Sequence, residues 1–258
     1  MQLLKLHGLG NDFLILLDVD GSQTIDAAFA RKVCDRHRGI GADGLIYAGP
    51  GADGSIATMT LLNADGSHAE ISGNGLRCLG LALSDSGWTP ERNFFVDTEA
   101  GRRQVMLRER LSATSMRIAT EMGDATLLEV PDQVHSLLPD HERVDFVSVG
   151  NPHVVVTVKD SDAVDAAVVG AAVDSAVVGG PNVHFVTQGD DGIHMNIYER
   201  GVGPTQACGS GACAVAASAR LPQTAVIMPG GTVQVTTGSP VVLEGTAHFV
   251  ATCEVPLG

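Results

Sequence analysis

The sequence predicts a mixed α/β (α+β) protein that contains two similar halves. Short alternating or β-branched runs predict strands, and stretches with the helical spacing of apolar residues lie between them. Two glycine-rich stretches, SGNGLRCLG from Ser72 and CGSGACAVA from Cys208, begin 136 residues apart, about half of the 258-residue chain. Each follows a strand-like segment and a polar turn, so a duplicated strand, loop and helix is the economical interpretation.

The strand predictions rest on four runs that alternate or are rich in β-branched residues, FLILLD, SIATMTLL, HVVVTV and TVQVTTG; they cover residues 13–18, 55–62, 153–158 and 232–238. A helix is predicted over 24–37, with Thr24 as its N-cap, and a second over 161–176, with Asp162 and Asp165 near its positive end. The turns NADGS (63–67) and PGG (229–231) separate elements.

Composition limits the classes of function. With 44% hydrophobic residues the chain can bury one large or two medium cores, and a net charge of −14 with only 16 Lys and Arg argues against nucleic-acid binding. The N-terminal MQLLKLHGLGNDF reaches glycines too soon for a secretory signal, and no run of about 18 apolar residues predicts a membrane span. We therefore expect a cytoplasmic protein that binds neither nucleic acid nor membrane.

The two glycine-rich stretches predict helix starts that bind anions. A helix N-terminus exposes unpaired N–H groups at the positive end of the dipole, and two such starts could hold one carboxylate. A cysteine there has its thiolate stabilised, so we expect the pKa of Cys208 to lie below the free value of about 8.5 and Cys208 to be catalytic. The five cysteines form no C-x-x-C pair, and the other four are interpreted as small buried residues: Cys34, Cys78, Cys213 and Cys253.

Seven motifs give the chain a specific resemblance: HGLGNDF from His7, NADGS from Asn63, GNG from Gly73, GNPH from Gly150, NVHFV from Asn182, ERGVGPTQACGSGACA from Glu199 and PGGTVQV from Pro229. In this order, they resemble the diaminopimelate epimerase family over nearly the whole chain. The resemblance implies two pseudo-symmetric domains, each a curved mixed or antiparallel sheet around a central helix, with the active site in the interdomain cleft. We expect the N-terminal half at 1–115, joined by a returning strand within 247–258, and the C-terminal half at 116–246.

The resemblance also implies a two-base mechanism, in which one residue removes the substrate α-proton and another donates a proton from the opposite face. Matched by position, Cys208 and Ser72 are the two acid/base positions, and His153 and Glu199 tune them. The substrate contacts implied in the same way are Asn11, Asn63, Gly73, Asn74, Asn151, Asn182, Glu199, Arg200, Gly209 and Ser210. For Asn63, within NADG, a turn residue is a strong alternative.

No cofactor or metal is expected. The only lysines are Lys5, Lys32 and Lys159, and none lies in these motifs, where a pyridoxal Schiff base would need one. No paired-histidine spacing suggests a metal centre. Seven histidines are therefore interpreted as ordinary polar residues: His7, His37, His135, His141, His184, His194 and His248. Neither glycine-rich stretch completes the dinucleotide pattern Gly-x-Gly-x-x-Gly.

Ser72 is the main departure from the family, which has a cysteine there; smaller departures are Gly44, Pro204 and Gln206. A serine hydroxyl is a far poorer base than a thiol. Three interpretations of Ser72 remain open. It is an engineered Cys-to-Ser change, or the chain is a natural one-cysteine relative (a hydroxyproline-type epimerase or dehydratase), or it is a catalytically dead amino-acid-binding module.

The prediction is thus a cofactor-independent isomerase that inverts an amino-acid α-carbon, converting L,L-diaminopimelate to the meso form, with activity lowered by Ser72. A role in lysine biosynthesis and a homodimeric assembly are implied by the resemblance alone.

Overall fold

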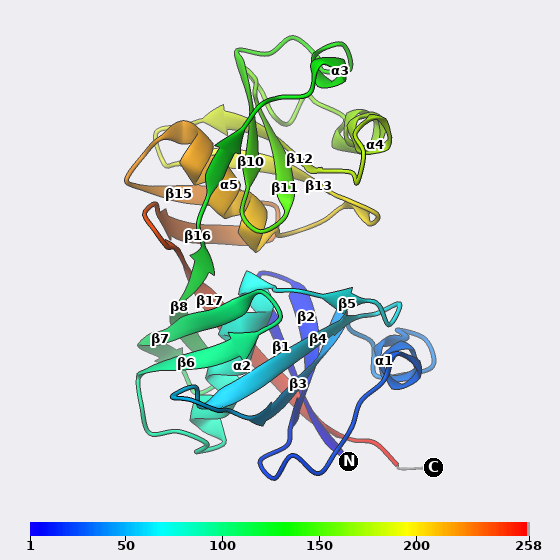
Figure 1. Ribbon diagram of the computed structural model, residues 1–258, viewed down its shortest axis with the longest axis vertical. Coiled ribbons are helices and arrows are strands. Elements are labelled where there is room, and N and C mark those ends of the chain that lie inside the picture. The colour runs from blue at the N-terminus through cyan, green and yellow to red at the C-terminus, as the bar shows by residue number, and fades with distance from the viewer. Residues whose placement is uncertain (257–258) are drawn as a thin grey trace. The chain divides into compact units, whose positions relative to one another are not determined.

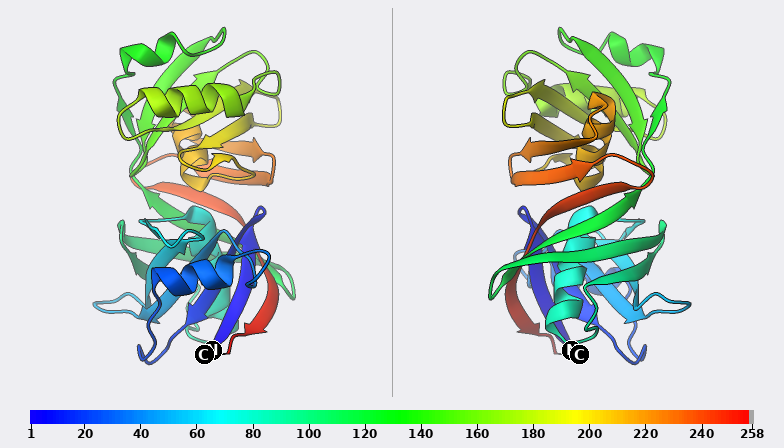
Figure 2. Two further views of the ribbon diagram at one scale, coloured as in Figure 1. Left: turned by 90° about the vertical axis from the view of Figure 1, so that its right-hand side faces the viewer. Right: turned by 90° about the vertical axis from the view of Figure 1, so that its left-hand side faces the viewer.

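The computed structural model describes residues 1–256, so the last two residues of the expected segment 247–258 lie outside the described residues. The chain forms two compact units, here called unit 1 (Met1–Glu121 with Glu244–Gly258) and unit 2 (Met122–Leu243). In each unit, strands surround one helix, α2 in unit 1 and α5 in unit 2 (Figure 1, Figure 2). The predicted α/β fold class is confirmed.

Unit 1 is a closed ring of strands. Its elements are β1 (Gln2–Gly8), β2 (Asn11–Leu17), α1 (Ala27–Cys34), β3 (Gly44–Pro50), β4 (Ala57–Asn63), β5 (His68–Ala69), α2 (Gly73–Asp85), β6 (Asn93–Thr98), β7 (Gly101–Ser112), β8 (Ser115–Gly123) and β17 (Val241–Glu254). The pairings run β17–β1–β2–β3–β4–β6–β7–β8, and β8 pairs with β17 again. Closure leaves this ring without free edges.

The elements of unit 2 are β9 (Thr126–Leu128), α3 (Asp132–His135), β10 (Arg143–Ser148), β11 (Pro152–Thr157), α4 (Ala166–Ala176), β12 (Asn182–Gln188), β13 (Ile193–Glu199), β14 (Gly203–Pro204), α5 (Gly209–Ala219), β15 (Gln223–Met228) and β16 (Gly231–Thr236). From β10 onward, unit 2 repeats the order of elements that unit 1 shows from β1 to β7, and β9 and α3 precede the repeat.

The pairing pattern relates the two units element by element. β1–β2 and β10–β11 are antiparallel, β2–β3 and β11–β12 are parallel, and β3–β4 and β12–β13 are antiparallel. The parallel pairs β4–β6 and β13–β15 follow, each after a short hairpin strand that leads into the central helix. The same succession of antiparallel and parallel pairings thus occurs in both units. A match over so many steps indicates that the units are internal repeats.

The parallel steps explain the outer helices. A parallel pair of neighbouring strands needs a long crossover, and α1 and α4 lie in the crossovers between β2 and β3 and between β11 and β12. In each unit an apolar cluster includes residues of the outer helix, with Ala30 and Val33 in unit 1 and Val173 in unit 2. These helices therefore cover the outside of the sheets, whereas α2 and α5 fill the inside.

Two helix boundaries differ from the sequence prediction. The first helix begins at Ala27 instead of 24, because Asp26, not Thr24, is the N-cap and accepts the Phe29 N–H over 2.7 Å. The second begins at Ala166 because the Asp165 side chain accepts the N–H groups of the first turn. All four predicted strands are present, as β2, β4, β11 and β16. None of the helices within residues 1–256 is long and apolar enough to cross a membrane.

The central helices are buried on every side, which their sequences permit. In α2, leucines surround the axis, and Leu76, Leu79 and Leu81 are fully buried. α5 is built from Gly, Ala and Ser with Cys213 and Val215, so strands approach it closely. A methyl group on Gly80 of α2 would lie 2.8 Å from Val105 Cγ1. Small residues on these helices therefore set how tightly the ring closes.

We predict that Gly80→Ala destabilises the protein by about 1–3 kcal/mol through overpacking against β7. Helix propensity alone predicts the opposite, a gain of up to about 1 kcal/mol. Urea unfolding measures the difference, with Ser84→Ala, near the C-terminal end of the same helix, as the control. A Gly80→Ala protein as stable as the parent would contradict the close packing described here.

Candidate functional site

The start of α2, here the α2 start (Ser72–Gly75), is capped by the residue that departs from the family pattern. Ser72 is in the extended conformation typical of an N-cap, and its Oγ accepts the Gly75 N–H over 3.1 Å. Gly73, Asn74 and Gly75 are buried. The Ser72 hydroxyl therefore has a structural role, satisfying one of the helix's free N–H groups.

A hydrogen-bonded chain fixes the polar side chains beside the α2 start. The buried Arg77 guanidinium donates to Asn74 Oδ1, and Asn74 Nδ2 donates to Asn11 Oδ1 over 3.1 Å. Asn11 Nδ2 in turn donates to Asp43 over 2.8 Å. Because every amide group in the chain has a fixed partner, the orientations of Asn11 and Asn74 are set. Sequence reasoning missed Arg77, since an arginine inside a helix gives no sign that it is buried.

A cluster of opposite charges fixes Asp43, the last member of this series of hydrogen bonds. Arg36 bridges Asp12 and Asp43, each over 2.7 Å, and Lys5 lies 3.0 Å from Asp12. Burial alone would raise the pKa of Asp12, but hydrogen bonds from Arg36 and Lys5 hold it below its ordinary value. The Asp12 carboxylate is thus an ionised acceptor at neutral pH, and Arg36 ties Asp43, the partner of Asn11, to it.

The start of α5, here the α5 start (Cys208–Gly211), has the same geometry with a thiol in place of the hydroxyl. Cys208 is the extended N-cap, and its Sγ accepts the Gly211 N–H over 3.3 Å. Ser210 Oγ lies 3.7 Å from the same sulfur. Asn151 Nδ2 donates to Ser210 Oγ over a long 3.5 Å. Three predicted site residues of unit 2 therefore meet at one helix start.

The predicted lowering of the Cys208 pKa was wrong. Burial, which leaves the residue 5% exposed, raises the pKa of the Cys208 thiol well above its ordinary value, and the nearby Glu199 carboxylate raises it further. The Gly211 N–H and Ser210 oppose this but do not outweigh it. Glu199 itself is held by Thr205, whose hydroxyl donates to Oε1 over 2.6 Å. The resting group is accordingly the neutral thiol, a proton donor.

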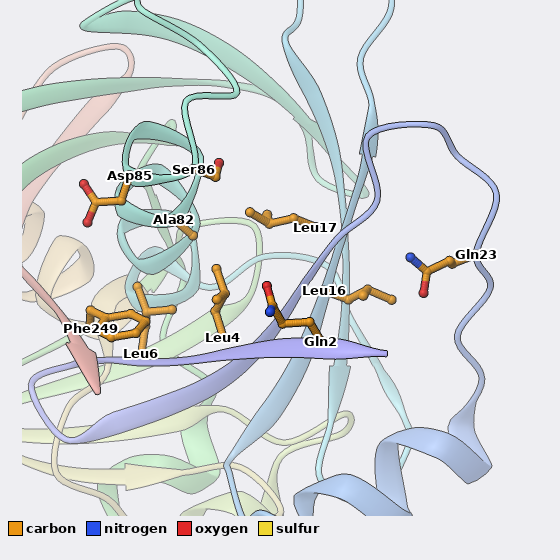
Figure 3. Close-up of a pocket in the computed structure, with 10 residues that line it drawn as sticks. All are labelled: Gln2, Leu4, Leu6, Leu16, Leu17, Gln23, Ala82, Asp85, Ser86 and Phe249. Atoms are coloured by element: carbon orange, nitrogen blue, oxygen red, sulfur yellow. The ribbon is translucent and has the colours of Figure 1, made fainter. Parts of the chain in front are cut away.

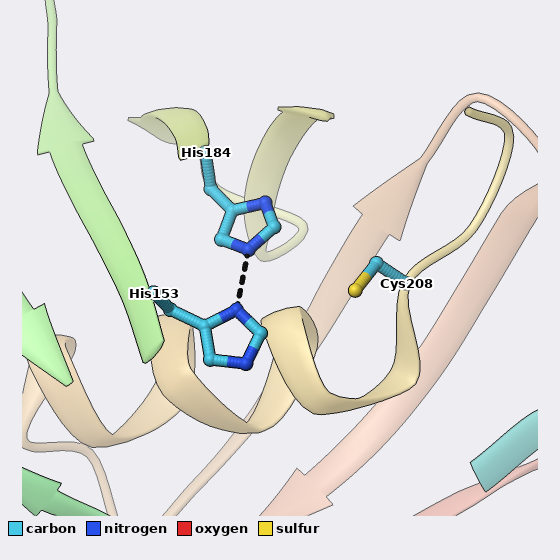
Figure 4. Close-up of side chains that lie close together, drawn as sticks. All are labelled: His153, His184 and Cys208. Carbon is cyan, nitrogen blue, oxygen red and sulfur yellow. Dashed lines mark hydrogen bonds between the residues drawn. The ribbon is translucent and has the colours of Figure 1, made fainter. Parts of the chain in front are cut away.

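His153 lies inside unit 2 in a pair that the sequence did not reveal. Its Nδ1 is 2.9 Å from His184 Nε2, and its Nε2 is 2.8 Å from Asn151 Oδ1. Both rings are fully buried, and Figure 4 shows them joined by this bond, with the Cys208 side chain directed toward them. Burial lowers the pKa of His184 to about 3, and that of His153 is lowered by burial, then by His184 and Arg200. Both are neutral imidazoles.

The alternation of residues along β12 is the sequence signal for the position of His184. Along β12, Asn182 and His184 alternate with Val183 and Phe185, which pack in the outer cluster under α4. A period of two places Asn182 and His184 on the opposite, inner face, toward α5. The interpretation of His184 as an ordinary polar residue is therefore corrected.

The other predicted contacts are held by backbone groups and turns. Asn182 Oδ1 accepts the Arg200 N–H over 3.1 Å, and the Arg200 guanidinium donates to the carbonyl of Gly179 over 2.7 Å. Asn63 is exposed and donates to Ser67 Oγ within the NADGS turn. Gly73 and Gly209 are the first residues of the two central helices. The substrate contacts of all these residues stay predictions.

One group of side chains has the donor types of a soft-metal site. The nitrogens of His153 and His184 and the sulfur of Cys208 lie within 4.8 Å of one another. A cation bound there would take His184 Nε2 as a ligand and move that ring's proton to Nδ1, which has no hydrogen-bond partner within residues 1–256. The hydrogen bond between His153 and His184 suits these rings better than a shared metal ion would, and the expected absence of a metal stays a prediction.

A cavity in unit 1 lies away from all of these residues. Its volume is about 340 Å³, and it is bordered by strands β1, β2 and β17, the Gln23 loop and the C-terminal end of α2 (Figure 3). From α2 it takes Ala82 and Asp85, with Ser86 just beyond, at the end of the helix opposite Ser72. It contains no predicted site residue, so the helix starts remain the candidate site.

Comparison with known proteins agrees with the fold and these motifs. The family model for diaminopimelate epimerase matches residues 3–128 and 146–250. The chain belongs to the diaminopimelate epimerase family. It is an isomerase, an amino-acid epimerase, as the sequence predicted.

The relatives of this family member cover almost its whole length. It is 38% identical to the diaminopimelate epimerase of Xanthomonas axonopodis pv. citri, over 97% of this chain and 94% of that protein. Identity to the enzyme of a Synechocystis strain is 34%, over 90% and 89%.

Solved structures share the fold at lower identity. A predicted epimerase from Pseudomonas aeruginosa has a TM-score of 0.75 at 17% identity, covering 100% of this chain and 99% of that one. A hydroxyproline epimerase from Agrobacterium vitis has a TM-score of 0.71 at 17% identity, over 100% and 92%. These likenesses show the two-domain fold alone.

We predict that Glu199→Gln speeds alkylation of Cys208 by iodoacetamide at pH 7, because removing the carboxylate lowers the thiol pKa. Each pKa unit lost raises the thiolate fraction about tenfold and lowers its nucleophilicity about threefold, for a net gain of about threefold. Mass spectrometry of the Cys208 peptide measures the rate, with Glu129→Gln, an exposed site of unit 2, as the control. Equal rates in the parent and Glu199→Gln would contradict the electrostatic coupling.

We also predict a loss of stability in mild acid from the buried imidazoles. The pKa of His184 falls from 6.5 in the unfolded chain to about 3 on folding, so below pH 6.5 the unfolded state binds more protons. Stability is complete above pH 6.5 and falls as pH decreases, by about 2 kcal/mol at pH 5 for this ring. Urea unfolding at pH 7.5 and 5.0 tests this, and His184→Ile should have the smaller pH dependence. Equal dependence in both proteins would count against a neutral buried His184.

Proposed function

We propose that the protein epimerises diaminopimelate between its L,L and meso forms without a cofactor, with Cys208 as one acid/base and Ser72 at the position of the other. The name of the family and of the relatives supports the substrate. The observation that carries the proposal is the equivalence of the two helix starts. In each, the N-cap side chain accepts the N–H of the residue three positions on.

The helix starts are assigned to the substrate α-carboxylate. Free N–H groups at a helix start favour an anion, and Asn11, Asn74, Asn151 and Ser210 supply polar groups beside the two starts. As the α-carbon loses its proton, negative charge grows on the carboxylate, where these donors are already in place. Preorganised donors would thus stabilise the carbanion more than the bound amino acid.

Proton transfer requires a base on one face of the α-carbon and an acid on the other. A neutral Cys208 thiol supplies the acid: it donates its proton to the carbanion and becomes a thiolate, which Gly211 N–H stabilises. In the reverse direction that thiolate removes the proton. Glu199 and His153 are assigned to tuning the acidity of Cys208. The carboxylate of Glu199 raises the pKa of the thiol, which makes the thiol a weaker acid and the thiolate a stronger base.

Ser72 limits this cycle. A serine hydroxyl stays protonated at neutral pH unless a neighbouring base activates it, and its assigned partner is the Gly75 N–H, which stabilises the cap but removes no proton. The proposal therefore assigns proton removal to the small thiolate fraction of Cys208, which takes the α-proton to become the thiol and, after that proton exchanges with solvent, returns a proton to the same face. The chain should exchange the α-hydrogen of one stereoisomer faster than it inverts the centre.

We predict that Ser72→Cys raises the epimerisation rate at least 100-fold, the usual minimum contribution of a positioned acid or base. The measurement is α-deuteration and stereochemistry of L,L-diaminopimelate in heavy water, for the parent and for Ser72→Cys. Ser72→Ala, which loses the cap and the acid/base position together, is the matched control. Ser72→Cys and Cys208→Ala together should return the rate to the background.

Other outcomes identify the alternatives. Exchange of 4-hydroxyproline but not of diaminopimelate by the parent would indicate a one-cysteine relative with another substrate. Saturable amino-acid binding without exchange, in both the parent and Ser72→Cys, would indicate a binding module. A homodimer and a role in lysine biosynthesis accompany the proposal on the resemblance, and the cytoplasmic location expected from the sequence stays a prediction. Sedimentation of the purified chain tests the homodimer.

A further inference from the structure

The repeat provides an internal comparison for the two buried histidines. Phe13 in β2 pairs with Gly44 in β3, and His153 in β11 pairs with Asn182 in β12, in the same parallel register. Ile46 and His184 come two residues after these partners on the same face. The pair His153–His184 in unit 2 thus occupies the positions of Phe13–Ile46 in unit 1.

The packing around the central helices confirms this equivalence. A methyl group on Gly75 in the α2 start would lie 3.1 Å from Ile46 Cδ1 and 3.3 Å from Met59 Cε. A methyl group on Gly211 in the α5 start would lie 2.5 Å from His184 Cε1 and 2.9 Å from Met195 Cε. In both units one strand residue and one methionine press against the first turn of the central helix.

Unit 1 shows that apolar side chains satisfy this packing. Phe13 and Ile46 belong to its apolar core, at 3% and 0% exposure. Two imidazoles buried in their place cost free energy of desolvation that the fold does not require. Their retention in unit 2, beside Cys208, points to a role in the site.

Hydrogen-bond geometry assigns a proton to each ring. Asn151 places Oδ1, an acceptor, 2.8 Å from His153 Nε2, so that nitrogen carries the proton. A neutral ring then has a bare Nδ1, which must accept the proton of His184 Nε2 over 2.9 Å. The remaining nitrogen, His184 Nδ1, has no hydrogen-bond partner within residues 1–256. A bare nitrogen costs less there than a buried N–H without an acceptor would.

The opposite direction of donation along these hydrogen bonds is disfavoured, because it leaves His184 Nδ1 without an acceptor. If His153 Nδ1 donated to His184, the His184 proton would sit on Nδ1, buried and without an acceptor. His153 Nε2 would also lose its proton, so Asn151 would have to turn its amide nitrogen toward the ring. The other end of the amide, facing Ser210, would then be the carbonyl oxygen.

We propose that His184 is a positioning residue that sets the direction of the chain His184 → His153 → Asn151 → Ser210, and so turns the Asn151 amide nitrogen toward the α5 start. A carboxylate needs donors, so this direction suits the anion, whereas the reverse would present an oxygen to it. The inference rests on the proposed function only for what the α5 start binds. The direction of the hydrogen bonds from His184 to Ser210 does not depend on the proposed function.

The direct test is side-chain ¹⁵N NMR of the histidine-labelled protein at pH 7.5, with resonances assigned by His153→Gln and His184→Gln. We expect both neutral rings to carry the proton on Nε2. A proton on Nδ1 of His184 would overturn the proposal. This measurement needs neither substrate nor activity.

Two variants of His184 separate positioning from packing. His184→Ile copies the residue of unit 1, so it should fold, but it cannot donate to His153; we expect L,L-diaminopimelate to bind about tenfold more weakly by calorimetry. His184→Gln supplies an amide N–H near the place of Nε2 and should bind within about threefold of the parent. Val156→Ala, a buried change in β11 outside the chain of bonds, should lower the melting temperature without changing affinity.

The outcomes distinguish this inference from the proposed function. Equal affinity of the parent, Ile and Gln proteins, all folded, would overturn the role of His184. Weakening by Ile and rescue by Gln would support it. If the parent itself does not bind diaminopimelate, the proposed substrate is wrong, and the NMR result alone decides the inference; should the Ile protein not fold, the NMR result and the Gln protein carry the test.

Discussion

The start of a buried helix is the constraint on which the rest of this structure depends. The first N–H groups of a helix have no partner within it, and in each unit the helix begins inside the sheet with little solvent to satisfy them. Ser72 and Cys208 each cover one such group with a side-chain oxygen or sulfur. The remaining N–H groups of the first turn have no partner within the helix. One arrangement therefore caps the helix and leaves the N–H groups that the proposal assigns to a carboxylate.

The same burial governs the chemistry of the N-cap. A helix start stabilises a thiolate, but desolvation and the Glu199 carboxylate outweigh it, and the pKa of Cys208 is raised. A thiol that is hard to ionise becomes a strong base once it has given up its proton. An enzyme that moves a weakly acidic α-proton benefits from such a base. Serine at the equivalent position keeps the cap but has far too high a pKa to take the same part.

The repeat shows how one plan was adapted in its two copies. Unit 1 fills the space beside its central helix with Phe13 and Ile46, and anchors Asn11 through Asn74, Arg77 and Asp43. Unit 2 uses two histidines in the equivalent core positions, and they hold Asn151 instead. Both solutions orient an asparagine at the end of the first hairpin. Burying two imidazoles costs more desolvation than burying Phe13 and Ile46, and the histidines are found in the unit whose central helix is capped by Cys208.

Local sequence determined the fold class, the strands and the helix starts, because alternation, helical spacing and Gly-x-Gly before a helix are properties of neighbouring residues. It also identified the family, since the motifs occur in order along the chain. Only the tertiary structure decided the raised pKa of Cys208, the burial of Arg77 and the pairing of His153 with His184. These depend on desolvation and on residues brought together from distant strands, which no local pattern encodes. The choice of Asp26 over Thr24 as a cap was decided in the same way, by which side chain reaches a free N–H once the helix has docked.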